Sequence, residues 1–225
     1  MPLQVLDLGR MPFERAFERQ EALVDARRRD QIPDTLVLTE HDPVYTLGRN
    51  ADPANVLLSD AALKAKGIGL VRTTRGGQVT YHGPGQLVGY PIIRLSAASK
   101  GVLWYVSMLE QILINVLARF GVQARTDSIN RGVWVGEAKI AALGVRVAGH
   151  VTMHGFSLNV TTRLEDYAGI VPCGIKTRGI TSLHLHRPDV RMDAVKPVVI
   201  EQFKLAFDYD RIDPAVEESE DGLCD

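Results

Sequence analysis

Hydrophobic residues recur at helical spacing in three long stretches of the chain, which cover residues 13–28, 104–120 and 193–207. Apolar side chains three and four positions apart share one face of a helix, so each stretch predicts an amphipathic helix packed on a core. Gly121 follows the second stretch and predicts its end. A shorter helix is predicted over 59–66, because Ser59 can cap its start and Gly67 can end it.

Short apolar runs between these helices predict β-strands over 34–39, 69–74, 86–93, 132–135, 139–147 and 151–160. The strands come in groups and do not alternate strictly with helices. This order predicts an α+β fold, with a mixed or antiparallel sheet and helices packed on it. Neither a repeat nor a Pro/Gly/Ser-rich linker divides the chain. We therefore expect one domain over residues 1–209 and an acidic, mobile tail over residues 210–225.

Composition places the chain among ordinary globular proteins, with 45% hydrophobic residues, 24% charged residues and a net charge of −1. Its two cysteines, Cys173 and Cys224, are too few for a disulfide scaffold and favour a reducing compartment. Residues 1–10 do not resemble a secretory signal, and the apolar stretch 102–120 contains too many polar residues for a membrane span. We expect a soluble, cytoplasmic protein that does not bind a membrane.

The charges are distributed unevenly along the chain. Residues 61–109 contain six basic residues and no acidic one, whereas residues 208–225 contain eight acidic residues and one basic residue. A basic face attracts acidic partners, so Arg72, Arg75, Arg94 and Lys100 are candidates for a docking surface. Solvated charges scattered over the surface would explain the same counts. Nucleic acid is not an expected partner, since no recognisable nucleic-acid-binding module is present.

The segment from Arg75 to Gln86 contains four glycines in twelve residues, between two predicted strands. Glycine allows a close approach of the main chain to a ligand, and polar side chains are interleaved with the glycines. A phosphate-binding loop is excluded because no Gly-Lys-Ser/Thr follows. A hairpin with a glycine turn remains an alternative at this point.

Four further residues have types suited to chemistry, and each also has a purely structural explanation. Cys173 lies between Pro172 and Gly174, where a turn can present its thiol, although most free cysteines are small buried side chains. Lys139 leads an apolar run and would be either a desolvated amine or a surface lysine. His154 could be an acid/base group or a structural histidine. Cys224 lies in an acidic stretch and is assigned no role. No metal site is expected, because no His/Asp/Glu cluster has suitable spacing.

Taken together and in this order, these segments resemble the signature of the lipoyl(octanoyl) transferase family. The resemblance is carried by residues 41–49, 75–86, 136–140, 154–159 and 172–174. Members of that family move an octanoyl group from acyl carrier protein to a lysine of lipoyl domains, the first step of endogenous protein lipoylation. The resemblance implies the fold of biotin and lipoate protein ligases, with a mixed, largely antiparallel sheet flanked by helices.

The resemblance also implies roles for individual residues. Cys173 would be the acyl-thioester nucleophile, and Lys139 would lower the pKa of its thiol and act as acid and base. The substrate-binding residues would be Arg75, Gly76, Gly77, Gln78, Val79, Thr80, Tyr81, His82, Ala142, Leu143, Gly144, Gly155, Phe156 and Ser157.

The partners implied are acyl carrier protein, which bears the acyl group on phosphopantetheine, lipoyl domains of 2-oxoacid dehydrogenases and the glycine cleavage H protein. No metal, ATP or other cofactor is expected, because a thioester is already activated. Three alternatives remain: an ATP-dependent lipoate or biotin ligase, a non-catalytic module that binds the carrier or lipoyl domains, and a cysteine hydrolase with His82 or His154 as base.

Overall fold

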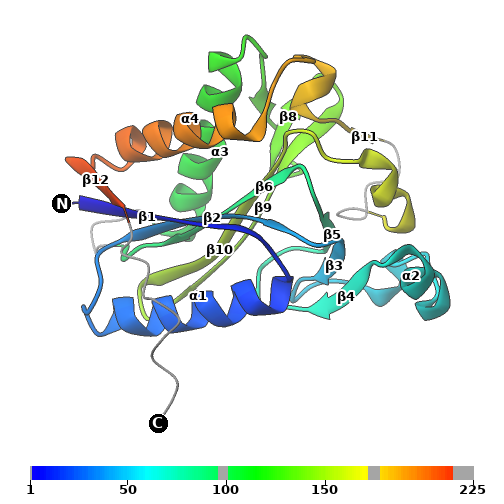
Figure 1. Ribbon diagram of the computed structural model, residues 1–225, viewed down its shortest axis with the longest axis horizontal. Coiled ribbons are helices and arrows are strands. Elements are labelled where there is room, and N and C mark those ends of the chain that lie inside the picture. Colours follow the sequence, from blue (N-terminus) through cyan, green and yellow to red (C-terminus); the bar gives the residue numbers. More distant parts are fainter. Residues whose placement is uncertain (1, 96–100, 172–177, 215–225) are drawn as a thin grey trace.

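A large mixed β-sheet runs through the centre of the molecule (Figure 1). The computed structural model describes residues 2–95, 101–171 and 178–214. The strand order is β12-β1-β2-β6-β10-β9-β8-β7, and β11 lies beside β9. Strands β12, β1 and β2 are parallel to one another, and β11 is parallel to β9. The other neighbouring strands are antiparallel. The strands are β1 (Pro2–Met11), β2 (Thr35–His41), β6 (Gln86–Ile92), β7 (Arg125–Thr126), β8 (Val133–Val135), β9 (Ala138–Ala148), β10 (Val151–Asn159), β11 (Gly179–Ile180) and β12 (Arg211–Pro214).

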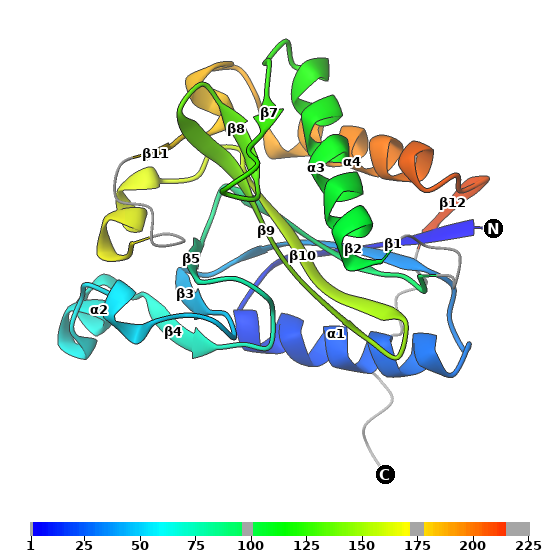
Figure 2. The ribbon, with the colours of Figure 1, turned by 180° about the vertical axis from the view of Figure 1, so that it is seen from behind.

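Helices cover both faces of this sheet. α1 (Phe13–Arg28) lies on one face, and α3 (Val102–Arg119) and α4 (Met192–Ala206) lie side by side on the other (Figures 1 and 2). The side of α3 that carries Tyr105, Leu109, Leu113 and Val116 is buried in the main hydrophobic core. Among the described residues, α3 is long and apolar enough to cross a membrane by length and composition alone. A core helix of a globular domain passes the same test, and the buried face of α3 is that of such a helix.

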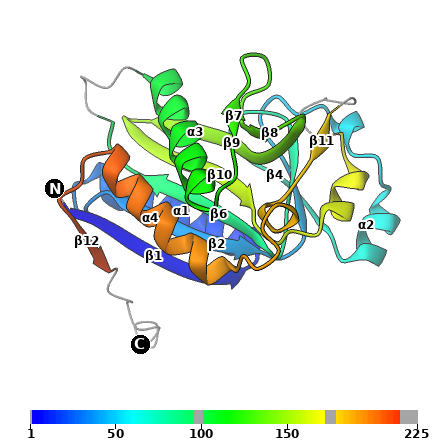
Figure 3. The ribbon, with the colours of Figure 1, turned by 90° about the horizontal axis from the view of Figure 1, so that it is seen from above.

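A second, smaller sheet lies at the end of the molecule away from the N-terminus (Figure 3). Its strand order is β4-β3-β5, and the short helices α2, η1 and η2 lie around it. Ser59 caps α2 by accepting a hydrogen bond from the main-chain N–H of Ala62, and Gly67 ends the helix at φ 65°, as the sequence predicted. The elements are β3 (Val44–Leu47), η1 (Pro53–Asn55), α2 (Asp60–Lys66), β4 (Gly69–Arg72), β5 (Val79–His82), η2 (Leu164–Gly169) and η4 (Leu183–Leu185).

The predicted helices and strands are present, but the sequence analysis missed β1, β3, β5, β7, β11 and β12. The glycine-rich segment is not a hairpin, because β5 pairs with β3 in the small sheet while β6 pairs with β2 and β10 in the large one. Residues Arg211–Pro214, expected at the start of the tail, form an edge strand paired with β1. The rest of the expected tail, residues 215–225, lies outside the described residues.

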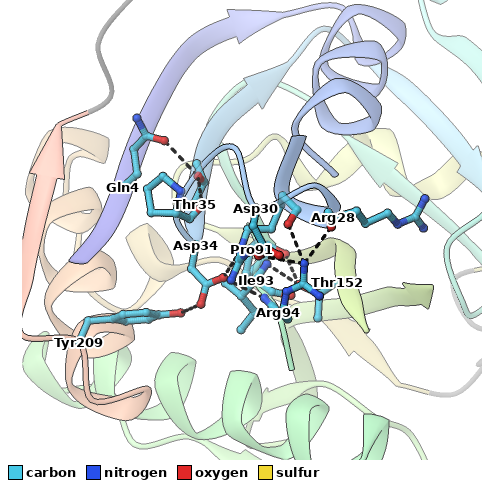
Figure 4. A network of polar contacts seen from close by, with 12 residues as sticks. Gln4, Arg28, Asp30, Asp34, Thr35, Pro91, Ile93, Arg94, Thr152 and Tyr209 are labelled. Atoms are coloured by element: carbon cyan, nitrogen blue, oxygen red, sulfur yellow. Dashed lines mark hydrogen bonds and ion pairs between the residues drawn. The ribbon is translucent and has the colours of Figure 1, made fainter. Parts of the chain in front are cut away.

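A buried carboxylate links the end of α1, the end of β6 and the segment after α4 (Figure 4). Asp34 accepts hydrogen bonds from Arg27 Nε at 2.7 Å, from the Arg94 main-chain N–H at 2.9 Å and from the Tyr209 hydroxyl at 2.9 Å. The Arg94 guanidinium donates in turn to Asp30 and to the main-chain oxygens of Arg27 and Arg28. Asp34 therefore ties the end of α1 to β6 and to the segment after α4.

We expect Asp34→Asn to lower the free energy of unfolding by about 3 kcal/mol, because it removes the buried counter-charge of Arg27 and leaves only the exposed Asp30 carboxylate beside the guanidinium. Urea denaturation monitored by circular dichroism measures the change. Asp193→Asn is the control, since its pair with Arg191 is exposed and should contribute less than about 1 kcal/mol. Equal effects of the two substitutions would contradict the importance of the buried pair.

Candidate active site

Side chains from distant parts of the sequence line one cavity, called here the main cavity. It lies where the start of α1, the small sheet and strands β6, β9 and β10 meet. Its lining residues are Phe13, Arg75, Gly77, Gln78, Val79, Thr80, His82, Val88, Tyr90, Ala142, Leu143, Gly144, His154, Gly155, Phe156 and Ser157. Apolar side chains and glycines make up much of this wall, so the cavity suits a ligand with an apolar chain.

The structure brings together the three segments that the sequence analysis singled out. Twelve of the fourteen expected substrate-binding residues line the main cavity, and the other two, Gly76 and Tyr81, do not. The Tyr81 hydroxyl donates a hydrogen bond to Asp166 Oδ2 at 2.9 Å, and the Gly76 main-chain N–H donates to Val145 O at 3.1 Å. These two residues therefore hold the glycine-rich segment to its neighbours, and the binding roles of the other twelve remain predictions.

Four lining residues were not among the expected set: Phe13, Val88, Tyr90 and His154. Val88 and Tyr90 are two positions apart on β6, and side chains with that spacing point to the same face of a strand. This spacing would have indicated both residues. Phe13 has no comparable signal, because only the packing of α1 against the sheet brings it to the cavity. His154 was singled out by sequence, and it lines the wall with its main chain at φ 58°.

A glycine allows two strands to approach closely beside the cavity. A Cβ atom on Gly155 of β10 would lie 2.2 Å from the main-chain oxygen of Gly89 on β6, a distance that no side chain tolerates. A glycine inside a strand is typical of a bulge or of a close main-chain approach. The structure shows the close approach, and it explains why this part of the wall is made of main chain.

Arg75 contributes a fixed positive charge to the wall of the main cavity. Its guanidinium is buried and donates to Thr46 Oγ1, to Thr46 O at 2.5 Å and to Gly76 O at 3.0 Å. A buried side chain held in this way does not contact the surface of a protein partner. Arg94 is likewise engaged at Asp34 and Asp30, whereas Arg72 is exposed, and Lys100 lies outside the described residues.

Three buried histidines lie in and beside the main cavity in neutral form. Burial lowers the pKa of His41 to about 4, and burial with the nearby charges of Arg75 and Arg146 lowers the pKa of His154 to about 3. Burial and repulsion from His41 hold the pKa of His82 well below its usual value. Neutral His41 donates from Nδ1 to Met11 O, so its Nε2 accepts the Tyr90 hydroxyl at 2.7 Å.

Stability should fall on acidification because His41 must remain neutral in the folded chain. Between pH 6.5 and 4 the unfolded chain binds a proton on His41 that the folded chain does not bind, so unfolding becomes easier as pH falls. This contribution is fully present above about pH 6.5 and decreases by about 1.4 kcal/mol per pH unit below it. Urea denaturation at several pH values should show a shallower slope for His41→Gln, and an unchanged slope would contradict the assignment.

Lys139 lies in β9 but lines a second cavity, not the main one. This second cavity is lined by Trp134, Lys139, Leu164, Tyr167, Ala168, Arg178, Gly179 and Ile180. The Lys139 ammonium is buried, donates to Arg131 O at 2.9 Å and lies 4.9 Å from the centre of the Trp134 ring. A register shift between β8 and β9 at Val133 and Trp134 marks a β-bulge next to Lys139, a device that re-aims side chains.

Cys173, the expected nucleophile, lies outside the described residues, which stop at Val171 and resume at Arg178. The described residues that follow it lie beside Lys139, since Ile180 is opposite Lys139 in the pairing of β11 with β9. The main-chain N–H of Thr181 also donates to Lys139 O at 2.9 Å. The proximity of Cys173 to Lys139 thus remains a prediction, and Cys224 also lies outside the described residues.

The sheet, its flanking helices and the cavity beside β9 and β10 define a class of fold, that of protein ligases for lipoate and biotin. A solved lipoate-protein ligase A bound with ATP matches with a TM-score of 0.78 at 20% identity, over 96% of this chain and 90% of that one. Biotin protein ligase from Aquifex aeolicus matches with a TM-score of 0.54 at 13% identity, over 92% of this chain and 70% of that one. The expected mixed sheet flanked by helices is confirmed.

Sequence comparison places the chain more narrowly. Residues 12–204 match the model of the lipoyl protein ligase A/B catalytic domain, and the chain belongs to that family. An octanoyltransferase from Alkaliphilus metalliredigens is 46% identical over 216 residues, which cover 95% of this chain and 99% of that protein. The family resemblance found in the sequence is therefore confirmed, and with it the expectation of an enzyme of the transferase class.

Proposed function

We propose that this chain transfers an octanoyl group from acyl carrier protein to a lysine of lipoyl domains, through a thioester on Cys173. The main cavity carries this proposal: segments 75–82, 142–144 and 155–157 converge on it, and its wall suits an acyl chain. Each methylene buried there contributes about 0.8 kcal/mol to binding. The similarity to octanoyltransferases supports the acyl group, and the resemblance of residues 172–174 supports the nucleophile.

The reaction has two steps that need no further activation of the acyl group. The Cys173 thiolate attacks the thioester carbonyl, a new C–S bond forms, and the phosphopantetheine sulfur leaves and takes a proton. The neutral lysine amine of the lipoyl domain then attacks, a C–N bond forms, and Cys173 Sγ leaves. Lys139 stabilises the thiolate by its charge and moves the proton in each step. Neither ATP nor a metal has a task in this sequence.

Intact-mass spectrometry tests the proposal directly. After incubation with octanoyl–acyl carrier protein, the chain should carry one octanoyl group on the peptide that contains Cys173, and hydroxylamine should remove it. Adding a lipoyl domain should move the group to lysine as a stable amide. Acylation at another residue, or none, would contradict the proposal.

The ATP-dependent ligase of the same fold is the second candidate, because the matched lipoate-protein ligase A has ATP bound. Free octanoate and ATP, added with a lipoyl domain and without carrier protein, separate the two functions. We expect no product in that mixture. Octanoyl-lysine formed from free octanoate and ATP would identify a ligase instead.

A further inference from the structure

A buried carboxamide connects the walls of the two cavities. Gln86 is fully buried; its Oε1 lies 2.7 Å from His82 Nδ1, and its Nε2 lies 2.9 Å from the Tyr167 hydroxyl. The same Nε2 lies 2.9 Å from Asn159 Oδ1 and 3.1 Å from Tyr81 O. His82 lines the main cavity and Tyr167 lines the second cavity, so Gln86 lies in the wall between them.

The acceptors around Gln86 fix the orientation of its amide. Tyr81 O is a main-chain carbonyl and can only accept, so the NH₂ group of Gln86 faces it and Oε1 faces His82. Asn159 agrees with this orientation, because its Nδ2 donates to Thr181 O at 3.0 Å and leaves Oδ1 to accept from Gln86.

The orientation of Gln86 determines the tautomer of His82. Gln86 Oε1 accepts only, so His82 Nδ1 carries the hydrogen. A neutral imidazole has one N–H, which leaves Nε2 with a lone pair. The ring stacks on Phe13, with centroids 6.1 Å apart, and packs edge-on against His41. His82 lines the main cavity, and because its hydrogen is on Nδ1, its Nε2 can accept an N–H or O–H but cannot donate to an oxyanion.

The polar cluster also reaches the strand of Lys139. Asn159 donates to Thr181 O, and the Thr181 main-chain N–H donates to Lys139 O. The imidazole of His82 and the main chain of Lys139 thus lie at the two ends of one hydrogen-bonded cluster. A substrate amine that attacks the acyl carbon beside this cluster has an acceptor available, which is His82 Nε2 at one end of the cluster.

We propose that His82 Nε2 accepts a hydrogen bond from the amine that receives the acyl group, and that Gln86 is the positioning residue that holds His82 in this tautomer. The inference rests on the proposed function and adds a group that acts on the amine in its second step. His82 takes no proton in this role; it orients the amine so that its lone pair faces the thioester carbon. The thioester group that Cys173 attacks has no N–H of its own, so the attack by the amine depends on this contact more than loading of Cys173 does.

Single-turnover measurements of the two half-reactions test the proposal. In His82→Leu, transfer to the lipoyl domain should slow about tenfold more than loading of Cys173 from octanoyl–acyl carrier protein does, as for one lost hydrogen bond. His82→Gln, which keeps an acceptor near the Nε2 position, should recover most of the transfer rate. His184→Leu is the control, because His184 lines neither cavity. An equal fall in both half-reactions, or an unchanged transfer rate, would overturn the proposal.

Nitrogen-15 NMR of the wild-type imidazole provides a test that does not depend on the folding of a variant. His82 should show a protonated Nδ1 and an unprotonated Nε2, and Gln86→Met should give a mixture of tautomers. A hydrogen on Nε2 in wild type would overturn the proposal. Absence of any loading of Cys173 in wild type would instead reject the proposed function itself, so the two failures are distinguishable.

Discussion

Alanine at position 173 should abolish the transfer of octanoyl groups to lipoyl domains. Without the thiolate there is no covalent carrier between the two protein substrates, and we expect the rate to fall by at least about 10³-fold. A gel-shift or mass assay of the acylated lipoyl domain measures the loss. The variant should also take up no octanoyl group from acyl carrier protein.

Cys224→Ala is the matched control for this substitution, because it removes the only other cysteine of the sequence. It should retain full activity. Full activity of Cys173→Ala would show that the acyl group moves directly between the substrates or through another nucleophile, and the thioester mechanism would be wrong.

The second large effect is expected at Lys139. Methionine preserves most of the length of this buried side chain but removes its charge and its hydrogen bond to Arg131 O. We expect transfer to fall by 10² to 10⁴-fold, the usual range for loss of a general acid–base group. The pH dependence of alkylation by iodoacetamide should also change, because the pKa of the Cys173 thiol rises when a neighbouring ammonium is lost.

Lys196→Met is the control for Lys139→Met. Lys196 lies in α4, pairs with Asp7 and lines neither the main nor the second cavity. Its replacement should leave both the transfer rate and the alkylation profile unchanged. If Lys139→Met lowers activity but leaves the alkylation profile of Cys173 as in wild type, the lysine does not stabilise the thiolate.

The helices were predictable from sequence because their apolar residues repeat with the helical period over many turns. The missed strands lack such a signal. β12 has charged residues at Arg211 and Asp213 and resembles the acidic segment that follows it. Among the residues that the structure describes, its strand neighbour is β1, near the other end of the chain, so a long-range contact decides its conformation.

The site was predictable in its parts but not in its connections. The segments of the main cavity follow from motifs, whereas the pattern of β9 does not reveal that Lys139 lines a different cavity or that the pairing of β8 with β9 shifts register beside it. Gln86 was noticed only as one polar residue of the glycine-rich segment. Its importance becomes visible when His82, Asn159 and Tyr167 are found around it, from three other elements.

Under the proposed function, the contact between Gly155 and the Gly89 carbonyl limits how the main cavity could be retargeted to longer or shorter acyl chains. Side chains cannot be added at Gly155 without separating two central strands, so that part of the wall is not adjustable. Ala142 and Ser157, paired across β9 and β10, and Phe13 from α1 line the same cavity with side chains. Variation in chain-length selectivity, by evolution or by engineering, should therefore concentrate at these three positions.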